Sequence, residues 1–145
     1  MEAVTDPVLA VRPMILLMED DPAVRRSLQL LLRARGFDVR AHAAGAPLLA
    51  DDNVGRAACL IADYRVDDID GIDLLVRLRA RHWAAPAILI TGYSSDLLRG
   101  RATAAGYAIV LDKPIRDHAL VEAVDRLTAP RLGADVLMEP ITLVK

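Results

Sequence analysis

Cysteine and aromatic residues are scarce in this sequence of 145 residues. It contains a single cysteine, Cys59, and Phe, Trp and Tyr together make up only 3%. One cysteine cannot form an internal disulfide, which excludes a disulfide-stapled scaffold and suits a reducing compartment. Because hydrophobic residues nevertheless reach 54%, we expect a core of Leu, Ile, Val and Ala, as layered α/β proteins have.

Long apolar runs and an excess of one charge are also lacking. No run approaches the roughly 20 residues that span a bilayer, and the first residues are acidic where a signal peptide starts with positive charge. The 18 basic and 20 acidic residues leave a net charge of -2, so no global field attracts nucleic acid or an anionic membrane. We therefore expect a cytoplasmic, single-domain protein without a direct nucleic-acid or membrane partner.

Apolar segments with strand character alternate with segments of helical periodicity. This alternation predicts a doubly wound, five-stranded parallel sheet with right-handed crossovers and helices on both faces. Residues 1–13 are interpreted as a leader, 14–128 as the domain, and 129–145 as a tail too short for an output domain, in which 141–144 could add a strand. The predicted strands are 14–18, 37–41, 59–63, 87–90 and 107–111, and the predicted helices are 22–35, 47–52, 72–81, 96–105 and 120–127.

Polar side chains lie at the carboxyl ends of four of the five predicted strands or directly after them. In parallel α/β sheets the carboxyl ends of the strands meet at one edge, where ligands collect. The turn after the first strand has carboxylates in place of the glycines that a dinucleotide site needs, and carboxylates suit Mg²⁺. Asp21, which precedes Pro22, is interpreted as a helix cap. The residues concerned are Glu19, Asp20 and Asp21 after the first strand, Asp63 at the end of the third, Thr91 after the fourth, and Asp112 and Lys113 after the fifth.

These residue types together predict phosphoryl chemistry. With Mg²⁺ bound, Asp63 could stay ionised among its acidic neighbours and attack a phosphoryl group. Lys113 and the Thr91 hydroxyl could then hold phosphoryl oxygens. The further carboxylates after Asp63 are interpreted as solvated loop or helix-start charges; they are Asp67, Asp68, Asp70 and Asp73.

These motifs resemble the receiver domain of two-component response regulators, which has a flavodoxin-like topology, across roughly residues 14–128. The resemblance implies that Asp63 is the phosphoacceptor, assisted by Thr91 and Lys113, with a cis bond before Pro114. Glu19, Asp20, Asp63 and the Arg65 backbone carbonyl would surround Mg²⁺. The motifs that carry it are 15–21, 60–63 with Asp70-Gly71, 90–92 and 112–114.

The resemblance implies a signalling switch rather than an enzyme, apart from self-catalysed phosphorylation and dephosphorylation of Asp63. A sensor histidine kinase or a histidine phosphotransfer protein would be the donor, and a homodimer could be the output. The sequence around Asp63, Thr91 and Lys113 is also similar to that of receivers in hybrid histidine kinases. The chain could therefore be a separate protein or a piece of a larger one.

The chain departs from the usual receiver pattern at two positions. Val110 stands where receivers often have an aromatic residue, three before the lysine, while Tyr107 lies six before it. Asp67 stands where many have proline. These departures motivate an alternative, an interaction module that works without phosphate. A magnesium-dependent hydrolase of the haloacid dehalogenase type fits less well. Such enzymes have the nucleophilic Asp and a second Asp two residues apart after the first strand, and this chain has no Asp-x-Asp there.

Overall fold

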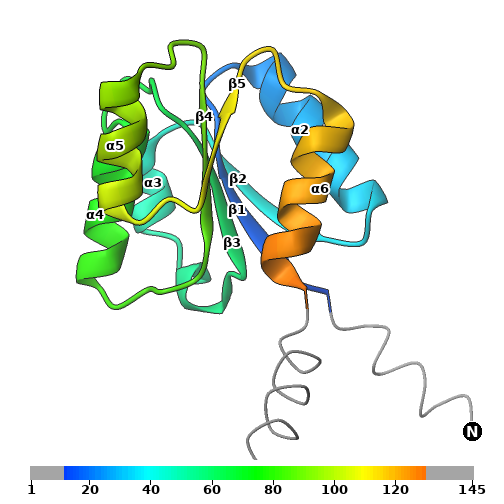
Figure 1. Cartoon of the computed structure of the whole chain (residues 1–145). Coiled ribbons are helices and arrows are strands. Elements are labelled where there is room, and N and C mark those ends of the chain that lie inside the picture. The colour runs from blue at the N-terminus through cyan, green and yellow to red at the C-terminus, as the bar shows by residue number, and fades with distance from the viewer. Residues whose placement is uncertain (1–11, 130–145) are drawn as a thin grey trace, which may run out of the picture.

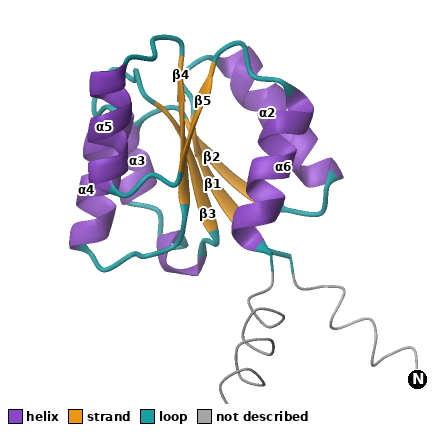
Figure 2. Ribbon diagram, viewed as in Figure 1, coloured by secondary structure: helices purple, strands orange, loops and turns teal. Residues whose placement is uncertain are grey.

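The computed structural model describes residues 12–129. These include only residues 12 and 13 of the predicted leader and only residue 129 of the predicted tail. The strand predicted at 141–144 lies outside the described residues. Within them one parallel sheet lies between two layers of helices (Figures 1 and 2). The elements are β1 (Met14–Met18), α2 (Pro22–Ala34), β2 (Asp38–His42), α3 (Gly45–Leu49), η1 (Val54–Arg56), β3 (Cys59–Asp63), α4 (Gly71–Ala80), β4 (Ala87–Thr91), α5 (Asp96–Ala105), β5 (Ile109–Asp112) and α6 (Asp117–Thr128).

All five strands are parallel, in the order β2-β1-β3-β4-β5. The three central strands are buried along their whole length. Strands covered on both faces are expected to be continuously apolar rather than alternating, which is the pattern that the sequence shows. The predicted fold class, a doubly wound five-stranded sheet, is confirmed.

Alternate residues of each central strand enter different halves of the core. Leu16 and Leu60 pack with residues of α3, α4 and α5, whereas Ile15 and Ile61 pack with residues of α2 and α6. Figure 1 shows the same division, with α3, α4 and α5 on one face of the sheet and α2 and α6 on the other.

The helix ends follow the signals in the sequence. The Asp21 carboxylate accepts hydrogen bonds from the amides of Ala23 and Val24, so its interpretation as a cap is confirmed. Ser95 caps α5 through the Leu98 amide, and Gly106 ends that helix in the left-handed conformation at φ 116°. No helix within residues 12–129 is both long enough and apolar enough to cross a bilayer.

Several predicted boundaries differ from the structure, and α6 begins at Asp117, three residues before the predicted start at 120. β2 begins at Asp38 rather than residue 37, and β5 spans Ile109–Asp112 instead of 107–111. The weak helix predicted at 47–52 is α3 at Gly45–Leu49. Its capping residue, Ala44, makes no side-chain hydrogen bond, so the local sequence holds no start signal.

Candidate functional site

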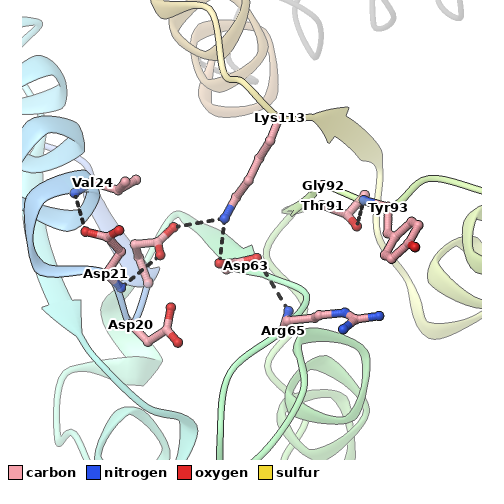
Figure 3. A pocket seen from close by; sticks show the side chains of 10 residues that line it. Asp20, Asp21, Val24, Asp63, Arg65, Thr91, Gly92, Tyr93 and Lys113 are labelled. Atoms are coloured by element: carbon pink, nitrogen blue, oxygen red, sulfur yellow. Dashed lines mark hydrogen bonds and ion pairs between the residues drawn. The ribbon is translucent and has the colours of Figure 1, made fainter.

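The register of the sheet brings the predicted site residues to one edge. Met18 is paired with Ala62, so the next residues, Glu19 and Asp63, lie side by side at the carboxyl ends of β1 and β3. Thr91 is paired with Asp112, which places Lys113 directly beyond it. The side chains line one open cavity of about 380 Å³, seen in Figure 3. Its lining includes Glu19, Asp20, Asp63, Arg65, Thr91, Tyr93 and Lys113.

Asp63 and Lys113 form the central ion pair of this cavity. Lys113 Nζ lies 2.9 Å from Asp63 Oδ2 and 3.8 Å from Glu19 Oε1. Burial lowers the pKa of the Lys113 ammonium, but the hydrogen bond and charge of Asp63, with the charge of Glu19, outweigh it and raise the pKa. The second Asp63 oxygen has only a 3.4 Å contact with the Arg65 amide and remains available to a ligand. The peptide bond between Lys113 and Pro114 is cis, as the resemblance implied.

Glu19, Asp20 and Asp63 form a carboxylate cluster that fits a hard cation. One oxygen from each lies within 4.8 Å of the others. Glu19 is 1% exposed, and its Oε1 has no hydrogen-bond partner. Burial raises the pKa of Glu19 to about 7, with the Asp63 charge adding to the rise against a hydrogen bond from the Asp21 amide. A buried carboxylate oxygen without a donor is unfavourable unless a cation binds it, so the cluster fits Mg²⁺.

Thr91 and Arg65 lie on the side of the cavity away from Asp20 and Asp21 (Figure 3). The buried Thr91 hydroxyl oxygen accepts a hydrogen bond from the Tyr93 amide at 2.9 Å, which leaves its hydrogen free to donate elsewhere. The Arg65 guanidinium lies 5.2 Å from the centre of the Tyr93 ring, a cation–π distance. Tyr93 is not among the residues that the sequence predicted for the site.

The loop between β3 and α4 is held by side-chain contacts that the sequence did not predict. Asp68 is exposed, as expected of a loop charge, but its carboxylate also accepts hydrogen bonds from the amides of Gly45 and Ala46 at 2.9 and 2.8 Å. These bonds cap the start of α3 and lower the pKa of Asp68. Asp70 caps α4 through the Asp73 amide, which agrees with its interpretation as a helix-start charge.

Solved structures identify the class of this fold. A CheY-like response regulator receiver domain protein from Methanospirillum hungatei superposes with a TM-score of 0.73 at 24% identity, over 80% of this chain and 93% of its own. The response regulator StyR superposes with a TM-score of 0.75 at 28% identity, over 92% of this chain and 66% of its own. The fold is therefore that of CheY-like receiver domains.

Sequence comparisons then give the family. Residues 15–125 match the family model of the response regulator receiver domain, and the chain belongs to this family. The transcriptional regulatory protein FixJ of Rhizobium meliloti is 30% identical over 119 residues, covering 82% of this chain and 58% of FixJ. FixJ of Azorhizobium caulinodans is 36% identical over 107 residues, covering 74% of this chain and 51% of that FixJ. The chain spans about half the length of these curated relatives.

Family membership makes the chain a receiver domain of two-component systems and does not favour the alternative of an interaction module that works without phosphate. The structure brings Glu19, Asp20, Asp63, Thr91 and Lys113 together in one cavity, as the order of the motifs predicted.

Proposed function

We propose that Asp63 accepts a phosphoryl group from a histidine kinase or a histidine phosphotransfer protein. An Asp63 oxygen attacks phosphorus, a new P–O bond forms, and the P–N bond to the donor histidine breaks with the electron pair returning to the imidazole. The product is an acyl phosphate on Asp63. The observation that carries the proposal is the convergence of a buried, lysine-paired Asp63 and the carboxylate cluster in one open cavity.

Lys113 and Thr91 would hold the transferred group. The Lys113 ammonium, now 2.9 Å from Asp63 Oδ2, can turn to a phosphoryl oxygen and keep a charge-assisted hydrogen bond. The Thr91 hydroxyl accepts from the Tyr93 amide and has one hydrogen left to donate to another phosphoryl oxygen. Both contacts would draw the loops after β4 and β5 towards Asp63, a rearrangement that could alter the surface shown to a partner or to a second copy of the chain.

Glu19, Asp20, Asp63 and the Arg65 backbone carbonyl are the groups that would hold Mg²⁺. When bound, the ion offsets the repulsion among the carboxylates and neutralises charge on the transferring group. The acyl phosphate would be lost when water attacks phosphorus, the bond to the Asp63 oxygen breaks and inorganic phosphate leaves. This limited, self-directed chemistry is all the catalysis that we propose for the chain.

Intact mass after incubation with acetyl phosphate tests this proposal. We expect one added phosphoryl group in the presence of Mg²⁺ and none with a chelator. Asp63→Asn should abolish labelling, whereas the matched variant Asp52→Asn, at an exposed loop position away from the cavity, should label like the wild type. Undiminished labelling of Asp63→Asn at another residue would contradict the assignment of the phosphoacceptor.

A further inference from the structure

Tyr107 is a buried aromatic residue that reaches from the start of β5 to the start of α4. Its side chain is 5% exposed, and its hydroxyl donates a hydrogen bond of 2.6 Å to the carbonyl of Gly71, 36 residues away in the sequence. Burial raises the pKa of the Tyr107 phenol, so the hydroxyl stays a neutral donor at every physiological pH. The sequence had shown Tyr107 only as an aromatic residue six positions before Lys113.

The backbone of Tyr107 is anchored at the other end of this connection. Its amide donates to the Ala102 carbonyl at 3.0 Å, which closes the end of α5. The next amide, that of Ala108, donates to the Ala87 carbonyl at 2.9 Å and begins the pairing with β4. The hydroxyl therefore extends from a point that α5 and the sheet both hold in place.

Gly71 is the residue at which the loop after Asp63 returns to the sheet. Its amide donates to the Tyr64 carbonyl at 2.9 Å. A Cβ atom at Gly71 would lie 2.9 Å from the Asp63 carbonyl oxygen and 2.7 Å from Leu89 Cδ1, so the Gly71 backbone is in direct contact with that of Asp63. A group that fixes Gly71 therefore also fixes the point at which the loop that carries Arg65 closes against the end of β3.

We propose that Tyr107 is a positioning residue for the phosphoacceptor site. By holding the Gly71 carbonyl, its hydroxyl keeps the loop after Asp63, which carries the Arg65 carbonyl, in the arrangement that Mg²⁺ binding and phosphoryl transfer require. Tyr107 itself touches none of the reacting groups. The inference rests on the proposed function of Asp63 and adds to it a residue of the α5 and β5 side of the domain.

Tyr107→Phe tests the proposal because it removes only the hydroxyl and leaves the ring in the core. If the free energy of one lost hydrogen bond of ordinary strength is transmitted to the site, the Mg²⁺ dissociation constant should rise about fivefold. We expect that loss in a calorimetric titration with Mg²⁺ alone. Labelling by acetyl phosphate at a single subsaturating Mg²⁺ concentration should slow by a similar factor.

Thr128→Val is the matched control. The Thr128 hydroxyl also donates to a backbone carbonyl, that of Val124 at 2.8 Å, but on α6 and outside the cavity. Both variants should unfold at lower urea concentration than the wild type, and only Tyr107→Phe should lose Mg²⁺ affinity. Amide hydrogen exchange gives a second reading: Arg65 and Gly71 should exchange faster in Tyr107→Phe and at the wild-type rate in Thr128→Val.

Equal Mg²⁺ affinity and equal loop exchange in Tyr107→Phe and the wild type would overturn the proposal and leave Tyr107 a core residue. The two proposals fail in different ways. If the wild type itself is not labelled at Asp63, the proposed function is wrong. If the wild type is labelled and Tyr107→Phe behaves like Thr128→Val, only the role of Tyr107 is wrong.

Discussion

Mg²⁺ binding should weaken about tenfold when the pH is lowered from about 8 to about 6. Glu19 has its pKa raised to about 7 by burial, and the role of metal ligand that we propose for it requires an ionised carboxylate, so below that pH a proton and Mg²⁺ should compete for it. For one competing proton the apparent dissociation constant rises by a factor of about ten per pH unit below the pKa, and it is nearly constant above it.

Calorimetric titration with Mg²⁺ in two buffers of different ionisation enthalpy measures both the affinity and the protons released. We expect nearly one proton per ion at about pH 6 and almost none at about pH 8. Glu19→Gln should bind more weakly at the higher pH and lose most of the pH dependence. Glu122→Gln, at an exposed position of α6, is the matched control and should behave like the wild type.

The metal-free protein provides an independent check of the same pKa. Because the folded pKa of Glu19 lies above its ordinary value of 4.5, the folded state holds the proton more tightly between these values. The free energy of unfolding should therefore fall as the pH rises from 4.5 to about 7, and saturating Mg²⁺ should restore it. The reasoning is refuted if Mg²⁺ affinity is the same at both pH values and no proton is released at the lower one.

Three further predictions concern stability and are each measured by urea unfolding. His82 has a left-handed φ of 68°, a conformation in which glycine is unstrained. His82→Gly should therefore raise the free energy of unfolding by about 1 kcal/mol, and a lower free energy of unfolding would contradict this. Gly71→Ala should destabilise by about 1–3 kcal/mol, since its Cβ would meet Leu89 and the Asp63 carbonyl, and wild-type stability would show that the loop yields freely. Asp51, with its side chain 1% exposed, accepts hydrogen bonds from Arg40 and Asn53 that hold its pKa low against burial. Asp51→Asn should therefore cost about 2 kcal/mol at neutral pH and less as the pH falls below 3.8, and a cost independent of pH would rule out this origin.

The elements of the core and the composition of the site could be predicted from the amino-acid sequence. The short, continuous apolar runs at β1, β3 and β4 predict strands covered on both faces, and the carboxyl ends of parallel strands lie at one edge of the sheet. Local signals likewise set the helix ends at Asp21, Ser95 and Gly106, because each of these residues bonds within its own turn or adopts a conformation that suits it.

Contacts between segments far apart in the chain could not be predicted, because they form only when the elements pack together. α3 begins at Gly45 because Asp68, 23 residues away, supplies the cap that its own sequence lacks. β5 starts two residues later than predicted, because Tyr107 first closes the end of α5 and then turns its ring into the core to reach Gly71. Neither contact is signalled by a periodicity or a local motif in the sequence. Each depends on how the loop after Asp63 packs against its neighbours once the sheet has formed.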